Sequence, residues 1–370
     1  MKEIQVKRFF ECLIPVTVCN LKCSYCYVIQ RDYRNMKLAE FKYTPEHIGK
    51  CLTKERLGGE CFFSICGAGE TLAQPETLQI VKELLRNEHI VNITTNGTLK
   101  NRFRELENFT QEEKERLHFS FSLHYLELKR LNLLETFFEN VLFVKNQGCS
   151  FIVQINLCDE YIPYLDEIKS TCESRIGAWP QVAATRRENS NFTKIEFLTE
   201  LSDEEYIARG REFNSPLFDY TIENFNVKRE EFCYAGERSG TLNLADGTLH
   251  KCYADPKPQR IFDNPCKPIV FEPIGTNCGC AFCLNSSHFM SQGVIDNGDK
   301  RTYCSLRDRP EAGWFNETMR TALSGKLWDT NPSLNLSEQE RFNRKQRVVI
   351  FYYKVRSAIA RPMKKIIGRK

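Results

Sequence analysis

The sequence of 370 residues lacks the features of a membrane-spanning or secreted protein. Its longest unbroken apolar run covers only residues 348–353, far short of the ~20 residues that a spanning helix needs. An apolar stretch at residues 9–18 follows two basic residues, but Glu11 interrupts it and no small-residue cleavage site follows. We therefore interpret this stretch as a buried strand rather than a signal peptide. Internal repeats and low-complexity stretches are also missing, and 41% hydrophobic with 27% charged residues excludes disorder throughout.

Cysteine, by contrast, is abundant. The chain has 17 cysteines, an odd number, and no secretory signal. A disulfide framework is therefore not expected, and the pattern favours reduced thiols that bind metal or pack as small apolar residues.

Charge is distributed unevenly along the chain. Residues 341–370 carry eleven Lys or Arg and no acidic residue, so the total of +4 leaves −7 for residues 1–340. A mildly acidic body argues against a nucleic-acid-binding core, and we expect no nucleic acid as partner. The basic tail, with interleaved aromatic and aliphatic residues, has the composition of a segment that contacts an anionic membrane surface. Nucleic-acid binding by the tail and a flexible solubilising end are the alternatives.

Residues 8–175 alternate between strand-like and helix-like patterns, and residues 181–186 are a candidate for a sixth strand. Short runs rich in β-branched and aromatic residues predict strands at residues 8–18, 61–66, 90–95, 118–123, 151–157 and 181–186. Apolar spacings of three and four predict helices between them at residues 75–88, 101–117, 128–147 and 161–173. Strands that alternate with helices indicate an α/β fold with a parallel sheet and right-handed crossovers.

Beyond residue 200 this alternation stops. Residues 228–310 are rich in Cys, Gly, Asp, Asn and Pro, and Asp246-Gly247 between two short apolar runs predicts a hairpin. A loop-rich region of this kind buries little apolar surface and usually needs a metal or similar crosslink. We expect four parts: an α/β domain at 1–200, a helical connection at 201–227, a cysteine-rich domain at 228–310 and a helical, basic tail at 311–370.

The most informative motif directly follows the first predicted strand. Residues 19–27 read CNLKCSYCY, which places three thiols, Cys19, Cys23 and Cys26, at the carboxyl end of a strand. Ligand sites of α/β sheets form at this edge. Three close thiols can hold three irons of an iron–sulfur cube, and without a fourth local cysteine one iron stays open to a ligand. Buried structural thiols, or half of a zinc site, are the simpler alternatives.

The string CxxxCxxC, with an aromatic residue before its last cysteine, resembles the radical S-adenosylmethionine (SAM) superfamily. The longer string resembles its branch with a SPASM or twitch-like auxiliary domain. This resemblance implies a partial (β/α)6 barrel. It also implies a four-iron four-sulfur (4Fe-4S) cluster on Cys19, Cys23 and Cys26, whose open iron binds SAM. One electron then cleaves SAM to a 5′-deoxyadenosyl radical, which abstracts hydrogen from the substrate.

Further motifs follow successive strands in the order found in that family. Residues 67–70 read GAGE and resemble its GGE motif, with Ala68 where glycine is common; residues 94–97 read TTNG and resemble its TNG segment. Each also fits an ordinary tight turn. The resemblance implies cofactor contacts from Tyr25, Gly67, Ala68, Gly69, Glu70, Thr95, Asn96, Ser122 and Asn156. His124 shares a strand face with Ser122 and is a candidate catalytic residue, although a structural role is the commoner one.

The cysteines of the second region resemble the opening half of the SPASM pattern. We expect one auxiliary 4Fe-4S cluster on Cys233, Cys252, Cys280 and Cys283, with Cys278 as a competing ligand. Cys266 and Cys304 are candidates for a second site. A structural zinc site is the alternative, because zinc shares the thiolate preference.

The leading hypothesis is a cytoplasmic radical SAM enzyme that receives electrons from a flavodoxin or ferredoxin and acts on a peptide or protein side chain. A second hypothesis is radical modification of a sugar or lipid-linked saccharide at the inner membrane face. A third is a non-catalytic, zinc-stapled binding protein.

Overall fold

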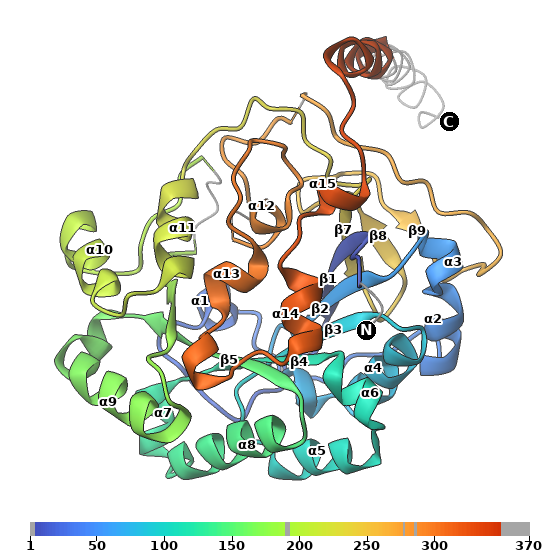
Figure 1. The fold of residues 1–370 in the computed structure, drawn as a ribbon. Helices are drawn as coiled ribbons and strands as arrows, with labels where there is room; N and C mark the ends of the chain where they lie inside the picture. The colour runs from blue at the N-terminus through green and yellow to red at the C-terminus, as the bar shows by residue number, and fades with distance from the viewer. Residues whose placement is uncertain (1–3, 189–192, 277, 285–286, 349–370) are drawn as a thin grey trace, which may run out of the picture.

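The computed structural model describes residues 4–188, 193–276, 278–284 and 287–348. One nine-stranded sheet organises the chain, in the order β6-β5-β4-β3-β2-β1-β7-β8-β9 (Figure 1). The strands are β1 (Arg8–Ile14), β2 (Cys61–Gly67), β3 (Ile90–Thr95), β4 (Leu117–Ser122), β5 (Ser150–Leu157), β6 (Gln181–Ala184), β7 (Ser239–Asn243), β8 (Thr248–His250) and β9 (Gln259–Arg260).

Strands β1 to β6 lie side by side in chain order and are all parallel. This confirms the predicted α/β fold with a parallel sheet, and each predicted strand overlaps an observed one. The second cysteine region joins the same sheet, because β7 pairs with β1 in parallel and continues into the antiparallel β8. The predicted Asp246-Gly247 hairpin is thus confirmed, and it extends the sheet.

Helices fill the crossovers and the C-terminal third. The α-helices are α1 (Tyr27–Gln30), α2 (Pro45–Cys51), α3 (Lys54–Leu57), α4 (Thr77–Arg86), α5 (Lys100–Arg104), α6 (Gln111–Glu115), α7 (Tyr125–Arg130), α8 (Leu134–Asn146), α9 (Leu165–Ile176), α10 (Asp203–Arg211), α11 (Pro216–Asn224), α12 (Phe289–Gln292), α13 (Tyr303–Arg307), α14 (Glu317–Leu323) and α15 (Leu327–Thr330). Short 3₁₀ turns are η1 (Thr71–Ala73), η2 (Glu105–Asn108), η3 (Asp159–Tyr164) and η4 (Pro310–Ala312).

All four predicted helices are shorter or broken, and two of them divide for local reasons. The helix predicted at 101–117 divides because Thr110 begins α6 with its own capping box to Glu113. The helix predicted at 128–147 divides into α7 and α8 around Asn132, which adopts a left-handed backbone with φ of 55°. Apolar periodicity runs through both breaks, so spacing alone does not reveal them.

The two faces of the sheet are covered differently. On the outer face Phe121 of β4 packs against Phe137 of α8. On the inner face His118 of the same strand packs against Tyr303 of α13. Figure 1 shows α5, α8 and α9 along one side of the sheet, with α13 and α14 across from them. The inner face is therefore closed by α13 over the amino-terminal half of the strands.

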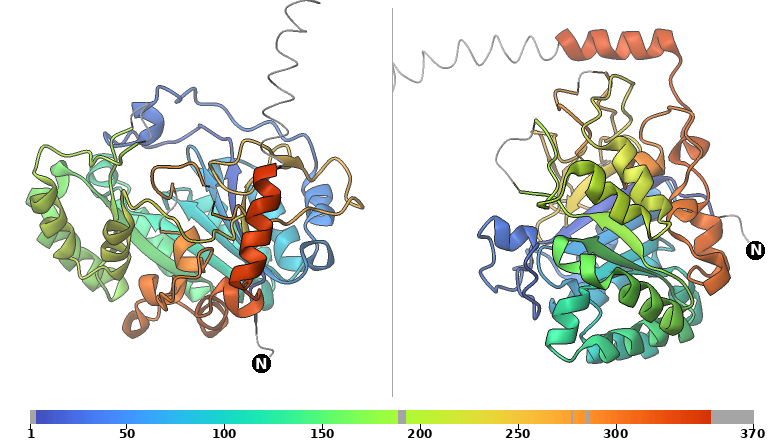
Figure 2. Two further views of the ribbon diagram at one scale, coloured as in Figure 1. Left: turned by 90° about the horizontal axis from the view of Figure 1, so that it is seen from above. Right: turned by 90° about the vertical axis from the view of Figure 1, so that its left-hand side faces the viewer.

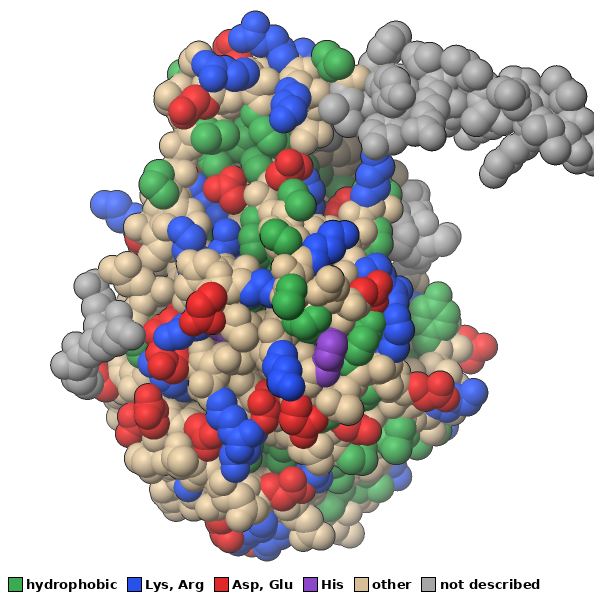
Figure 3. Space-filling view, turned by 90° about the vertical axis from the view of Figure 1, so that its right-hand side faces the viewer, with side chains coloured by type: hydrophobic (Ala, Val, Ile, Leu, Met, Phe, Trp, Pro, Cys, Tyr) green, Lys and Arg blue, Asp and Glu red, His purple; other side chains and the backbone are tan. Residues whose placement is uncertain are grey.

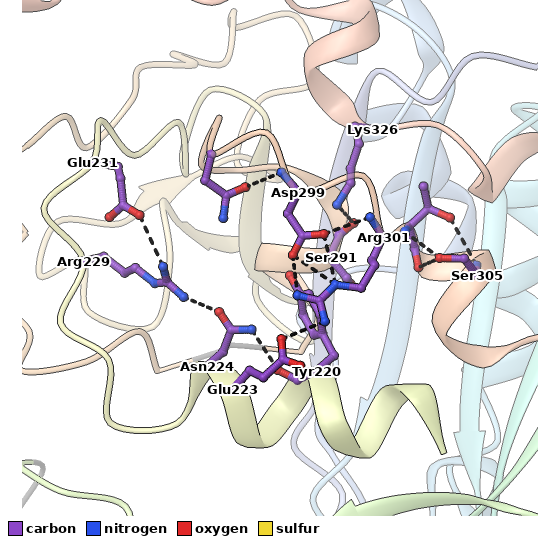
Figure 4. Close-up of polar contacts among 12 residues, drawn as sticks. Tyr220, Glu223, Asn224, Arg229, Glu231, Ser291, Asp299, Arg301, Ser305 and Lys326 are labelled. Carbon is purple, nitrogen blue, oxygen red and sulfur yellow. Dashed lines mark hydrogen bonds and ion pairs between the residues drawn. The ribbon is translucent and has the colours of Figure 1, made fainter. Parts of the chain in front are cut away.

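A polar network fixes the segment that leads into α13 (Figure 4). Arg301 forms ion pairs with Asp299, at 2.8 Å, and with Glu223 of α11, at 2.7 Å. Lys326 reaches the same region and donates to the carbonyl of Ser291 at 2.9 Å. These contacts tie the C-terminal segments to α11, which packs against β6.

Residues 336–348 form a further helix that projects from the body (Figure 2). Its Phe342 packs against Phe232, and its Asn343 accepts a hydrogen bond from the backbone N–H of Thr276 at 3.2 Å. Acidic and basic side chains are interspersed over the face of the body shown in Figure 3. Across the described ranges, no helix is long and apolar enough to cross a membrane. The basic residues predicted beyond 348 lie outside the described residues.

Candidate metal centre and cofactor site

The loop that carries the first three cysteines leaves β1 at the carboxyl edge of the sheet. Cys23 is buried, whereas Cys19 and Cys26 are half-buried. Burial, together with the neighbouring thiols of Cys19 and Cys26, raises the pKa of the Cys23 thiol to about 12. The structure therefore brings the three predicted ligands together.

Hydrogen bonds that involve side chains of neighbouring segments hold this loop in place. Asn20 donates to the Thr98 hydroxyl at 2.9 Å, and the N–H of Lys22 donates to Glu127 of α7 at 2.8 Å. Arg34 donates to the carbonyl of Cys19 at 2.8 Å. The loop is thus attached to the segments after β3 and β4 as well as to its own strand.

Tyr25 fixes the loop from inside the protein. Its hydroxyl lies 2.7 Å from Nδ1 of His124 and 3.0 Å from the hydroxyl of Tyr161. Burial lowers the pKa of His124 to about 4, so the imidazole is neutral near pH 7. His124 lies at the start of α7, just after β4, where it holds Tyr25. Its predicted catalytic role therefore stays a prediction beside this observed structural contact.

The GAGE loop approaches the cysteine loop closely. A Cβ added to Gly69 would lie 2.3 Å from the carbonyl oxygen of Val18, and one added to Gly67 would lie 2.7 Å from Val16. The N–H groups of Gly69 and Glu70 donate to the carbonyls of Val16 and Val18 at 2.6 and 2.7 Å. The glycines thus allow this loop to position the chain that leads into Cys19.

The carboxylate of Glu70 points into the protein and joins two loops. Oε1 accepts from the Thr95 hydroxyl at 2.7 Å and from the N–H of Leu72 at 3.0 Å, and Oε2 accepts from the N–H of Asn96 at 2.7 Å. Glu70 is only 2% exposed, and burial raises its pKa. Its carboxylate therefore holds the TNG segment. The predicted cofactor contact of this loop would fall to its backbone.

Partly exposed side chains line the inner face of the sheet toward the carboxyl ends of the strands, beyond the part that α13 covers. Pairing places Leu13 beside Cys66 and Ser122 beside Gln154, and these residues are exposed or half-buried while their strand neighbours are buried. Leu13 is 43% exposed although it lies within a core strand. Ser122 and Asn156, both predicted cofactor contacts, belong to this half-buried set. The carboxyl half of this face therefore carries half-buried, mainly polar side chains beside the cysteine loop, and we call this surface the lumen.

The second region brings its cysteines together from separate segments. Burial raises the pKa of Cys252 to about 12, with further contributions from the neighbouring thiols of Cys278, Cys280 and Cys283. Cys233 has Cys252, Cys278 and Cys283 among its electrostatic neighbours. The five residues Cys233, Cys252, Cys278, Cys280 and Cys283 are therefore neighbours, and their roles as ligands stay a prediction.

The two remaining candidates of this region have other surroundings. Cys266 is exposed and lies near Arg56. Cys304 is buried in α13, where its thiol interacts with Ser324. These neighbours give no support to a second site built from both residues.

The cysteine loop can be compared with the geometry that an iron–sulfur cluster requires. Within the described ranges, no three His, Cys, Asp or Glu side chains are arranged to hold one metal ion. An iron–sulfur cube binds each thiolate at a different iron, so its ligands do not converge on one point. Three neighbouring, partly buried thiols on the braced loop fit such a cluster, with Cys19, Cys23 and Cys26 as its ligands.

Several site residues escape sequence reasoning. Glu127, Arg34 and Tyr161 hold the cysteine loop, yet they lie between 8 and 135 residues away from it. No local motif marks them. Glu11 interrupts the apolar sequence of β1, and its carboxylate lies 3.3 Å from Nδ1 of His288.

Comparison with known proteins gives a family match for part of the chain. Residues 13–136 match the model of the radical SAM superfamily. This range runs from β1 into α8 and includes the cysteine loop, the GAGE and TNG segments and His124. A search of curated proteins found no match.

Solved structures with detectable similarity include SuiB from Streptococcus suis bound to S-adenosylmethionine, with 16% identity and a TM-score of 0.46 over 71% of this chain and 64% of SuiB. SuiB bound to its precursor peptide SuiA gives 15% identity and a TM-score of 0.46, over 73% of this chain and 65% of SuiB. The anSMEcpe structure with bound AdoMet gives 17% identity and a TM-score of 0.48, over 71% of this chain and 77% of that protein. The chain thus spans just under two thirds of the length of SuiB.

Radical SAM proteins are enzymes that use a 4Fe-4S cluster and S-adenosylmethionine. The match over residues 13–136 includes all three cysteines of the loop that follows β1. Residues 13–136, from β1 to the start of α8, therefore match the radical SAM superfamily.

Proposed function

We propose that this protein abstracts a hydrogen atom from its substrate by radical SAM chemistry. When bound, the 4Fe-4S cluster and SAM supply a 5′-deoxyadenosyl radical through one-electron cleavage of the sulfonium. The observation that carries the proposal is the loop of Cys19, Cys23 and Cys26, braced at the carboxyl edge of the sheet beside the polar lumen.

In this proposal the protein's own residues bind the cluster and orient SAM. Cys19, Cys23 and Cys26 hold the cluster, and the backbone of the GAGE loop lies against the segment that leads into Cys19. Ser122 and Asn156 offer hydrogen bonds from the lumen wall. Tyr303 of α13 packs on Phe62 and His118 and covers the amino-terminal half of the inner face.

We propose a peptide or protein side chain as substrate. The support is the SPASM-like cysteine region, which is common in peptide-modifying members, together with a lumen whose Ser, Thr, Gln and Asn side chains suit hydrogen-bonding groups. A lipid-linked saccharide is a second candidate. The observation that favours it is the set of exposed basic side chains on the projecting helix: Arg341, Arg344, Lys345 and Arg347.

We further propose one auxiliary 4Fe-4S cluster on Cys233, Cys252, Cys280 and Cys283. Its support is the gathering of these thiols from the segment before β7, the end of β8 and a later loop. Cys278 interacts with the Cys280 side chain and remains the competing ligand. Such a cluster would relay an electron or bind substrate, and a flavodoxin or ferredoxin would supply electrons.

The test compares three proteins after anaerobic reconstitution: wild type, Cys23→Ala and Cys266→Ala. We expect wild type and Cys266→Ala to release 5′-deoxyadenosine and methionine from SAM with dithionite, because Cys266 is exposed and is not one of the proposed cluster ligands. We expect Cys23→Ala to give only background. Release from Cys23→Ala at the wild-type rate would contradict the proposal. Deuterium transfer from labelled peptides or saccharides into 5′-deoxyadenosine would then identify the substrate class.

A further inference from the structure

The amide side chain of Asn96 lies between the TNG segment and the cysteine loop. Nδ2 lies 3.8 Å from Sγ of Cys19 and 2.9 Å from Oδ1 of Asn20. The residue is 4% exposed, so water does not compete for either contact. An amide nitrogen has two hydrogens, and the two acceptors use both.

The orientation of this amide is fixed by its other end. Oδ1 accepts from the N–H of Thr98 at 3.1 Å and from its hydroxyl at 2.7 Å. Both are donors, so the oxygen must face Thr98 and the nitrogen must face Cys19. The backbone N–H of Asn96 is bound by Glu70 at 2.7 Å. Asn96 is therefore held before any cluster is present.

We propose that Asn96 is a positioning residue that tunes the SAM-binding cluster by donating a hydrogen bond to the Cys19 thiolate. This rests on the proposed function, and it differs from the SAM contact that the sequence predicts for Asn96. Hydrogen bonds to cluster sulfurs help to set the reduction potential. Reduction adds one electron, taken from the external donor, and part of the added charge lies on the sulfurs. A donor at Cys19 stabilises that charge and raises the potential.

The cation of Arg34 strengthens this asymmetry. Its Nη2 donates to the carbonyl of Cys19 at 2.8 Å, which places a positive charge beside the same ligand. Cys23, by contrast, neighbours the segment whose N–H is bound by the Glu127 carboxylate. Asn96 and Arg34 therefore act on Cys19, whereas Cys23 has the Glu127 carboxylate and a hydrogen bond from Tyr25 as its neighbours.

The test measures the midpoint potential of the reconstituted full-length protein by redox titration monitored by electron paramagnetic resonance. Asn96→Leu is neutral and removes the donor. Asn96→Asp keeps an oxygen for Thr98 and places a carboxylate near Cys19. Asn140→Asp is the matched control, because Asn140 donates to the carbonyl of Gly97 at 2.8 Å in the same loop without a thiol contact. Iron content and thermal unfolding confirm that each variant is loaded and folded.

We expect the potential to fall from wild type to Asn96→Leu and further to Asn96→Asp, with Asn140→Asp near wild type. A wild-type potential in loaded Asn96→Leu would overturn the inference and leave the proposed function intact. An equal drop in Asn140→Asp would also overturn it, since loop disturbance would then suffice. A wild-type protein that binds no reducible cluster would overturn the proposed function itself, and the inference with it.

Discussion

His118 shows how a single buried side chain makes this fold sensitive to acid. It lies on β4 between the rings of Tyr303 and Phe315. Neither of its ring nitrogens has a hydrogen-bond partner in the described part of the chain. Burial, followed by the charge of Arg307, lowers its pKa to about 3. The folded state therefore accepts only the neutral imidazole.

The sign of the pH effect follows from that lowered pKa. The unfolded imidazole titrates near 6.5, so His118 contributes stability above that pH, and this is lost as pH falls from 6.5 toward 3. His118→Phe keeps a ring between the neighbours of His118. Between pH 7 and pH 5, we expect the free energy of unfolding to fall by about 1–2 kcal/mol less in this variant than in wild type. Urea unfolding at both pH values measures this. An equal fall in the free energy of unfolding for both proteins would show that His118 does not take up a proton when the protein unfolds.

At the scale of elements, the site depends on how closely two loops approach. The loop after β2 hydrogen-bonds the segment after β1, and parallel strands bring these ends to one edge. Gly69 leaves no room for a side chain there. The same edge collects Thr95 and Asn96 from the end of β3 through Glu70. The cysteine loop is thus placed by three consecutive strand ends.

The close contact between these two loops is tested by comparing Gly69→Ala with the control Gly279→Ala. A Cβ on Gly69 would meet backbone at 2.3 Å, whereas one on Gly279 would meet nothing within 4 Å. Because backbone cannot rotate away, we expect Gly69→Ala to cost about 1–3 kcal/mol of unfolding free energy, comparable to overpacking. Gly279→Ala should stay within about 0.5 kcal/mol. Denaturant unfolding of both apoproteins measures the difference, and matched stabilities would refute the steric argument.

At the scale of the whole molecule, a mildly acidic body carries a basic projecting helix. The described part of this helix, residues 336–348, is docked on the cysteine-rich region through Phe342 and Asn343. Its basic side chains point to solvent, and Val348 is 69% exposed. This arrangement leaves the basic surface available to an anionic partner.

Charge reversal tests membrane contact without removing the docked residues. We expect the triple change Arg344→Glu, Lys345→Glu and Arg347→Glu to lower sedimentation with vesicles that contain phosphatidylserine, since each basic residue near such a surface contributes about 1 kcal/mol. Neutral vesicles and the exposed pair change Arg104→Glu with Glu107→Arg are the controls. Wild-type protein that stays in the supernatant with anionic vesicles would end the membrane hypothesis.

The sequence by itself determined the strands, the hairpin and the cysteine motif, because these depend on local periodicity, turn chemistry and spacing. It also placed GAGE and TNG at strand ends. Only the tertiary structure showed that Glu70 binds the TNG segment, that Asn96 faces Cys19 and that His124 holds Tyr25. These contacts join residues 26 to 99 positions apart, and side-chain direction at such separations is set by packing between strands rather than by any local pattern.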